Sequence, residues 1–315
     1  MTSKHTEAHS VETSINNKGG TTMSLPEFDY IAAKSLKEAS DLVAEHGEKC
    51  IVMSGGTDVI ILLKENVLKD VDTVIDLKTI PDLEQLEFVE GEGLKIGSNT
   101  KLFTIQSSPV VNDKMPAVAQ AAHYVASSQI RRKGTMAGNI CNASPSADTA
   151  PILLAMNATV NTYDQNGGRK IAIDDFFKGV KKTCLDKSKG ELVTSIEIPE
   201  LKSGEGSAYF KHSVRKAMDL AIIGVAAWIK MDGEKVADCR IALGGVSVTP
   251  MRAVEAEKML IGNEISDELL EKVGVKASSE CHPISDVRAS AEYRTDMVRV
   301  YTKRAIKKAL ETMKA

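Results

Sequence analysis

The chain has 315 residues, 43% of them hydrophobic, and is long enough for two domains with packed cores. Its formal net charge is -3 and only 4% of its residues are aromatic, which disfavours nucleic acid and anionic membrane surfaces as partners. The longest apolar stretch, residues 220–229, is far short of the roughly 20 residues of a membrane-spanning helix, so we expect no membrane span.

The first 23 residues are polar and lack the apolar core of a signal peptide. We expect residues 1–23 to be a disordered tail, with translation starting at Met1 or at Met23. The five cysteines are scattered without a C-x-x-C spacing. The sequence therefore predicts no metal site in this chain, and it predicts reduced thiols in a cytoplasmic protein.

Short apolar runs separated by glycine-rich turns organise the first two thirds of the chain. The predicted strands are residues 50–53, 73–77, 86–89, 94–96, 158–163, 169–173 and 191–198. The predicted helices are residues 58–65, 100–107, 116–128 and 152–156. The turns "EGEG" and "DQNGG" predict two hairpins, and Thr57 or Asp58 is suited to cap the first helix.

The character of the chain changes after "KSGEG", residues 202–206, which is the best candidate for a linker. The predicted strands that follow are residues 208–214, 222–231 and 235–246, the last two joined by a tight turn at "MDGE". Three helices are predicted after them, over residues 252–260, 266–279 and 291–313. Strands followed by helices indicate an α+β fold.

Two glycine-rich segments are candidates for anion binding. Loop 1, residues 54–58 ("SGGTD"), lies between a predicted strand and a predicted helix, and loop 2 is residues 134–139 ("GTMAGN"). Successive backbone N–H groups in such turns bind phosphate, and a pyrophosphate held between the two loops would suit a dinucleotide. Ordinary turn chemistry is the alternative, because neither loop matches G-x-G-x-x-G or carries the lysine of a P-loop.

Seven stretches together resemble a known family. They are "SGGTDVIILLK", "IGSNTKLFTIQSSPVV", "IRRKGTMAGNICNASPSADTAPILLAMNATV", "FFKGVKKTCL", "LVTSIEIP", "FKHSVRKAMDLAI" and "SDVRASAEYR". In this order they resemble the FAD-binding medium subunit of the molybdenum hydroxylases, from residue 24 to about residue 308. That family includes the carbon monoxide, xanthine and nicotinate dehydrogenases and 4-hydroxybenzoyl-CoA reductase.

The resemblance implies a domain organisation. Residues 24–201 would form a two-subdomain FAD-binding domain of the vanillyl-alcohol oxidase (PCMH) type. Residues 206–313 would form a C-terminal flavoprotein domain of the carbon monoxide dehydrogenase type, with a three-stranded antiparallel sheet and a helical bundle.

The resemblance also implies a set of FAD-binding residues. Loop 1 would hold the pyrophosphate, Asp148 would contact the ADP part, and Lys211 would approach the flavin. The full set comprises Met53, Ser54, Gly55, Gly56, Thr57, Asp58, Thr135, Gly138, Asn139, Ser144, Asp148, Val193, Tyr209 and Lys211. A solvated strand edge is the alternative for Lys211 and Arg215.

By resemblance, the chain is an electron-transfer flavoprotein without a catalytic acid or base of its own. A large partner subunit would carry the molybdenum cofactor and a small one two [2Fe–2S] clusters. Electrons would pass from the clusters through FAD to an acceptor such as NAD or a quinone. The substrate of the large subunit would be a purine, another N-heterocycle, an aldehyde or carbon monoxide. The assembly would be a dimer of heterotrimers.

The chain departs from the family pattern in two respects, which concern the turn of loop 2 and the branch of the family. Ala137 stands where many members have glycine, so loop 2 is expected to differ slightly in its turn. No four-cysteine insertion is present, which disfavours the benzoyl-CoA reductase branch. Two other classes of function stay open from the sequence. One is a self-sufficient flavin oxidase or reductase, and the other is a flavin-free assembly subunit.

Overall fold

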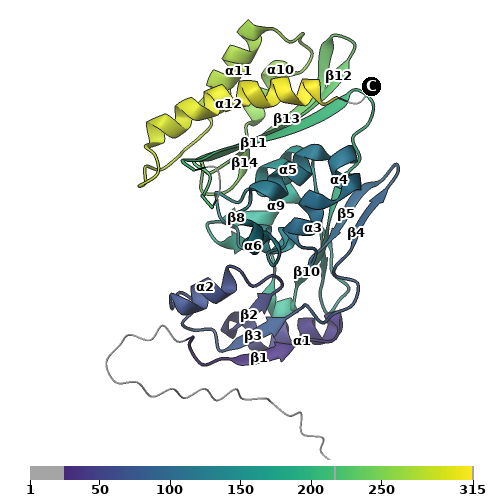
Figure 1. The fold of residues 1–315 in the computed structure, drawn as a ribbon, viewed down its shortest axis with the longest axis vertical. Helices are drawn as coiled ribbons and strands as arrows, with labels where there is room; N and C mark the ends of the chain where they lie inside the picture. The colour runs from purple at the N-terminus through teal and green to yellow at the C-terminus, as the bar shows by residue number, and fades with distance from the viewer. Residues whose placement is uncertain (1–24, 216–217, 314–315) are drawn as a thin grey trace, which may run out of the picture.

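Three β-sheet layers follow one another along the long axis of the molecule (Figure 1). The structure is a computed structural model, which describes residues 25–215 and 218–313. The predicted tail at residues 1–23, with the alternative start at Met23, lies outside the described residues. The first layer is parallel, whereas the second and third are antiparallel.

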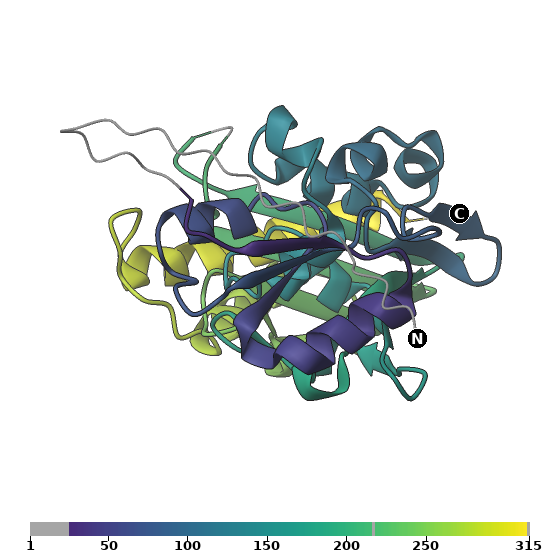
Figure 2. The same ribbon diagram turned by 90° about the horizontal axis from the view of Figure 1, so that it is seen from below.

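The first layer is a three-stranded sheet in the order β1-β3-β2. Its strands are β1 (Asp29–Ala32), β3 (Thr73–Asp76) and β2 (Cys50–Met53). All four residues of the central strand β3 are buried, as expected of a parallel strand covered on both faces. Helix α1 (Leu36–His46) follows Ser35, whose hydroxyl caps it, and lies along the sheet (Figure 2). Helix α2 (Val59–Lys64) follows β2.

The second layer is a five-stranded sheet in the order β4-β5-β10-β6-β7. Its strands are β4 (Leu86–Val89), β5 (Gly93–Gly97), β10 (Leu192–Pro199), β6 (Thr159–Tyr163) and β7 (Lys170–Ala172). The associated helices are α3 (Leu102–Ser107), α4 (Pro109–Lys114), α5 (Pro116–Tyr124), α6 (Ser128–Arg131), α7 (Met136–Cys141), α8 (Ala150–Ala155) and α9 (Ile173–Phe176). A small hairpin joins β8 (Phe177–Gly179) to β9 (Lys182–Thr183). Both hairpins predicted from the turns are confirmed.

The third layer is a four-stranded antiparallel sheet in the order β11-β12-β13-β14. Its strands are β11 (Glu205–His212), β12 (Ile223–Asp232), β13 (Lys235–Gly244) and β14 (Met251–Arg252). The expected three strands are present, and the two-residue β14 corrects their number to four. Helices α10 (Val254–Leu260), α11 (Asp267–Ser279) and α12 (Ala291–Glu311) complete this layer, with α12 packed on β11 and β12.

The third layer packs closely on the second. Helix α8 contacts β12 and β13, and α5 contacts β11. A Cβ atom on Gly244 would lie 3.0 Å from the ring of Pro151 in α8, and a Cβ atom on Gly224 would lie 3.0 Å from the Tyr209 hydroxyl. Gly244 therefore allows helix α8 to approach the sheet, and Gly224 leaves room for the Tyr209 hydroxyl. The two layers share a core that includes Tyr209 and Ala226.

Two predicted boundaries are wrong for identifiable reasons. Helix α5 ends at Tyr124 rather than at residue 128, because Ala126 adopts a left-handed backbone with φ 45°. The predicted linker at residues 202–206 is shorter, because β11 already begins at Glu205, whose carboxylate accepts a hydrogen bond from the Lys202 N–H. No helix within residues 25–215 and 218–313 is long and apolar enough to cross a membrane.

Candidate functional site

Loop 1 leaves the end of β2 and enters α2 in direct contact with loop 2. A Cβ atom on Gly55 would lie 2.4 Å from the carbonyl oxygen of Lys133 and 2.7 Å from the Cα of Gly134. Gly56 has φ 77°, and a Cβ atom there would lie 2.9 Å from the sulfur of Met53. The glycine pair is therefore required both by the close approach of the loops and by the left-handed turn.

The backbone of loop 1 has the donors that an anion needs. Among the described residues, none accepts a hydrogen bond from the N–H of Gly55, Gly56, Thr57 or Asp58. Asp58 precedes α2 as its N-cap residue, yet neither it nor Thr57 caps the helix with its side chain, which corrects that prediction. The Asp58 carboxylate instead accepts a hydrogen bond from Asn142 Nδ2 at 3.0 Å.

Ser54 joins loop 1 to two other segments. Its Oγ lies 2.9 Å from the carbonyl oxygen of Ser98, 2.7 Å from Asn99 Oδ1 and 3.3 Å from Thr135 Oγ1. The Asn99 amide donates in turn to the carbonyl oxygen of Leu77 at 2.8 Å. Ser98 and Asn99 are not among the predicted site residues, although the stretch "IGSNT" contains both.

Loop 2 is ordered by its own side chains. Thr135 caps α7, with its Oγ1 accepting from the Gly138 N–H at 3.0 Å, and a Cβ on Gly138 would lie 3.0 Å from that oxygen. Asn139 Oδ1 accepts from the Thr149 hydroxyl at 2.6 Å, which ties loop 2 to the segment that carries Asp148. Ala137 lies inside α7 and is not among the residues with positive φ, so alanine is not strained at this position.

Asp148 is a buried carboxylate with two side-chain partners. It is only 7% exposed, and it accepts hydrogen bonds from the Tyr209 hydroxyl at 3.1 Å and from Lys211 Nζ at 2.8 Å. Burial raises the pKa of Asp148 from 3.8 to about 6, and the charge of Lys211 partly offsets this. Nearby, Ser144 Oγ accepts from the Ser146 N–H at 3.4 Å.

Lys211 is fully engaged inside the protein. Its ammonium donates to Asp148 and also to the carbonyl oxygens of Tyr124, at 3.0 Å, and Asp219, at 2.7 Å. The side chain is 6% exposed, so the solvated strand edge considered for Lys211 is wrong, whereas the Arg215 side chain is 69% exposed. Tyr209 is 1% exposed, and burial followed by the Asp148 charge raises the pKa of its hydroxyl.

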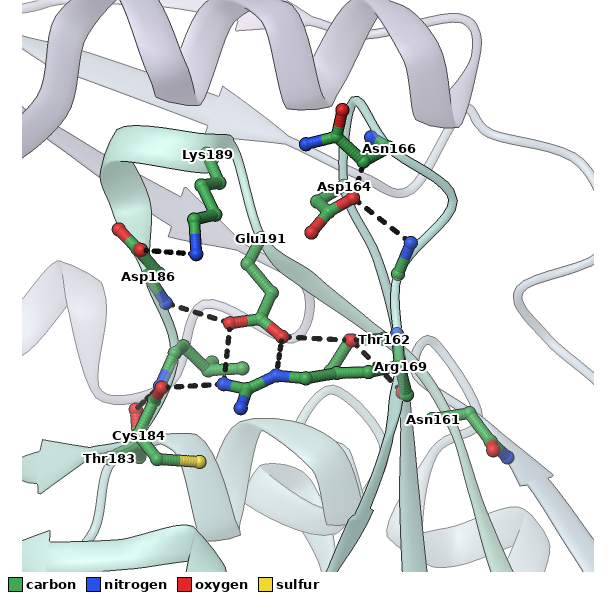
Figure 3. Close-up of polar contacts among 12 residues, drawn as sticks. Asn161, Thr162, Asp164, Asn166, Arg169, Thr183, Cys184, Asp186, Lys189 and Glu191 are labelled. Atoms are coloured by element: carbon green, nitrogen blue, oxygen red, sulfur yellow. Dashed lines mark hydrogen bonds and ion pairs between the residues drawn. The ribbon is translucent and has the colours of Figure 1, made fainter.

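Val193 lies on β10 next to the residues that Ser54 contacts. It is 6% exposed, and the following carbonyl, that of Thr194, accepts from the Ser98 N–H at 2.9 Å. Two residues before Val193, Glu191 makes a forked ion pair with Arg169, with its carboxylate oxygens 2.7 Å from Nε and 3.0 Å from Nη2 (Figure 3).

Glu191 also accepts from the Thr162 hydroxyl at 3.0 Å and from the Asp186 N–H at 2.9 Å. Burial by itself would raise the pKa of Glu191, but the bonds from Arg169, Asp186 and Thr162 outweigh burial and lower it. This cluster fixes the start of β10 against β6 and the preceding loop.

The predicted residues thus form one continuous region. Ser54 links loop 1 to loop 2, and Asn139 links loop 2 to the segment of Asp148. Asp148 in turn binds Tyr209 and Lys211. Free N–H groups in loop 1 suit a pyrophosphate, and a buried carboxylate in the same region suits a ribose hydroxyl. These N–H donors and this carboxylate fit the pyrophosphate and the ribose of FAD. No group of three or more His, Cys, Asp or Glu side chains within residues 25–215 and 218–313 is arranged to hold a metal ion.

Two family models match the chain. The model for the FAD binding domain in molybdopterin dehydrogenase matches residues 26–201, and that for the CO dehydrogenase flavoprotein C-terminal domain matches residues 208–309. The chain is 38% identical over 282 residues to the glyceraldehyde dehydrogenase medium chain of Sulfolobus acidocaldarius, covering 90% of this chain and 98% of that protein.

Solved structures agree with the family models. A carbon monoxide dehydrogenase from Hydrogenophaga pseudoflava that lacks the Mo-pyranopterin moiety of its cofactor matches with a TM-score of 0.88 and 30% identity, covering 92% of this chain and 100% of that chain. Quinoline 2-oxidoreductase from Pseudomonas putida 86 matches with a TM-score of 0.83 and 26% identity, covering 91% and 98%. The chain therefore belongs to the family of FAD-binding subunits of molybdopterin dehydrogenases.

Proposed function

We propose that this chain is the FAD-carrying medium subunit of a molybdenum hydroxylase complex. A large subunit with the molybdenum cofactor would hydroxylate the substrate, and a small subunit with [2Fe–2S] clusters would deliver the electrons to this chain. FAD supplies the ability to store two electrons and to pass them to an acceptor such as NAD or a quinone. The chain's own residues would bind and orient the cofactor.

The main support for the proposal is the close contact between loops 1 and 2. The free N–H groups of loop 1, at Gly55 to Asp58, are the proposed pyrophosphate site. Asp148 is the proposed contact of the ADP part, while Val193, Tyr209 and Lys211 are proposed to line the remainder of the site. Met53, Ser54, Thr135, Gly138, Asn139 and Ser144 complete the proposed set.

The proposed domain division follows the family models. Residues 24–201 would bind FAD and residues 206–313 would form the C-terminal flavoprotein domain. The proposed assembly is a dimer of heterotrimers, and the relatives named as medium chains support the presence of further subunits. A cytoplasmic location is proposed, and the five free thiols support it.

The proposal makes substrate oxidation depend on partner subunits. The relatives include enzymes named for glyceraldehyde, carbon monoxide and caffeine, so an aldehyde, carbon monoxide or a purine is the proposed substrate class. Adding glyceraldehyde, carbon monoxide or xanthine anaerobically to the isolated FAD-loaded chain should leave the flavin oxidised. Bleaching of the flavin by any of them without partner subunits would instead establish a self-sufficient flavin enzyme.

A further inference from the structure

One buried hydroxyl beside the proposed FAD site has no hydrogen-bond partner in the described part of the chain. It is the Oγ of Ser98, a residue that is 2% exposed. Buried polar groups in folded proteins are nearly always hydrogen-bonded, because a hydroxyl that leaves water without a new partner loses its bonds to water. The unpartnered Ser98 hydroxyl therefore requires an explanation.

The polar side chains that follow Ser98 do have partners. Asn99 uses both ends of its amide, with Oδ1 facing the loop 1 hydroxyl at 2.7 Å and Nδ2 donating to a carbonyl oxygen at 2.8 Å. The Thr100 hydroxyl donates to the carbonyl oxygen of Gln85 at 2.6 Å. Ser98 is thus the exception in a segment whose other polar side chains are hydrogen-bonded.

The backbone of Ser98 contacts the proposed FAD site on two sides. Its carbonyl oxygen accepts from Ser54 Oγ at 2.9 Å, and Ser54 is the first residue of loop 1. Its N–H donates at 2.9 Å to the carbonyl oxygen of Thr194, the residue after Val193. Ser98 therefore lies next to the loop whose free N–H groups are the proposed pyrophosphate site.

Other buried side-chain atoms without partners lie away from these residues. Within residues 25–215 and 218–313 they are Ser40 Oγ, Gln106 Oε1, Arg131 Nε, Arg294 Nε and Thr302 Oγ1. Of the six residues with such an atom, Ser98 is the one that is hydrogen-bonded to a member of the proposed FAD-binding set. The location of the Ser98 hydroxyl points to the cofactor as its missing partner.

We propose that Ser98 is a further FAD-binding residue, whose hydroxyl donates a hydrogen bond to a phosphate oxygen of the FAD pyrophosphate. The inference rests on the proposed FAD site. A serine hydroxyl can donate as well as accept, whereas an ionised phosphate oxygen accepts, so the hydroxyl is the donor. Hydrogen bonds to a charged acceptor are stronger than those between neutral groups. Binding of FAD would thus satisfy a hydroxyl that folding leaves unpaired.

The test measures two properties of the full chain, the urea midpoint of its FAD-free form and its Kd for FAD by isothermal titration calorimetry. Ser98→Ala removes the hydroxyl and keeps the rest of the side chain. We expect the FAD-free variant to unfold at the wild-type urea midpoint or above it, because no bond within the protein is lost. We expect FAD to bind about tenfold more weakly, since one bond to a charged acceptor is missing.

The matched control is Ser40→Ala. Ser40 is 0% exposed, and its Oγ likewise has no partner in the described part of the chain. It lies in α1, which contains none of the proposed FAD-binding residues. The same substitution at this position should also leave the urea midpoint at or above the wild-type value, but the Kd for FAD should stay within about twofold of the wild type.

ADP identifies the part of FAD that accepts the bond, because it carries both phosphates without the ribityl chain and the flavin ring. We expect Ser98→Ala to weaken ADP binding by about the same factor as FAD binding. A wild-type affinity for ADP together with a weakened affinity for FAD would contradict the assignment to the pyrophosphate.

An FAD affinity of S98A equal to that of the wild type would overturn the inference and leave the FAD site standing. A lowered urea midpoint of FAD-free S98A would also overturn it, because the hydroxyl would then have a partner inside the protein. An equal loss of FAD affinity in S40A would show an indirect effect and contradict the direct bond. A wild-type chain that binds no FAD would overturn the proposed function itself.

Discussion

Gly55 and the carbonyl oxygen of Lys133 are so close that a methyl group on Gly55 would lie 2.4 Å from that oxygen. Real Cβ atoms do not come so near to a backbone oxygen, so any other residue at position 55 must push loop 1 away from loop 2. The contact joins segments 78 residues apart in the sequence, and it explains why the end of β2 carries glycine rather than another small residue.

Gly56→Val should abolish stoichiometric FAD binding without global unfolding. Valine is strained at φ 77°, so the backbone of loop 1 must shift. The Met53 side chain, whose sulfur would lie 2.9 Å from the added Cβ, must move as well. FAD content after purification and far-UV circular dichroism give the two readouts. Gly91→Val is the matched control, because Gly91 has φ 84° and nothing within 4 Å of its Cβ position. A G56V protein that keeps one FAD per chain would contradict the proposal that loop 1 binds the pyrophosphate of FAD.

Asp148→Asn should change the pH dependence of stability. The folded pKa of Asp148, about 6, exceeds its ordinary value of 3.8, so between these values the folded state holds the proton more tightly than the unfolded state. The stability of the wild type relative to D148N should therefore fall as pH rises from about 4 to 6, by up to about 3 kcal/mol, and level off above. Urea unfolding at several pH values measures it, and a relative stability that rises over this range would contradict the assignment.

Glu191→Ala should destabilise the protein by about 2–4 kcal/mol. The substitution leaves the Thr162 hydroxyl, the Asp186 N–H and the Arg169 guanidinium without their shared partner at a side chain that is 2% exposed. Glu197→Ala on the same strand is the matched control, because its ion pair with Lys170 is largely exposed. Denaturant unfolding should show a loss of less than about 1 kcal/mol for this control. Equal losses in the two variants would contradict a special role for Glu191.

The sequence predicts the elements with strong local signals better than the contacts between them. The two hairpins, the glycine pair of loop 1 and the strands-then-helices order of the C-terminal part follow from local patterns, and the structure contains them. The parallel pairing of β1 with β3 depends on residues far apart in the sequence, so periodicity could not predict it.

Several features of the site could not be predicted from the sequence, because they depend on side-chain contacts between residues that are far apart in the chain. Asp58 is a suitable residue in a suitable position to cap α2, but its carboxylate accepts a hydrogen bond from Asn142, which is 84 residues away. Lys211 lies on an alternating strand where solvent exposure is the ordinary expectation, yet Asp148 and two carbonyls bury it.

The most direct test of the central claim is a visible absorption spectrum of the purified chain, before and after incubation with FAD and then after anaerobic addition of NADH. The FAD-subunit account predicts the two flavin bands with one FAD per chain, and their bleaching would identify NAD as the acceptor. Bands that NADH leaves unchanged would keep the FAD site and indicate a quinone or another carrier. A folded chain that stays colourless after incubation with FAD would contradict the account.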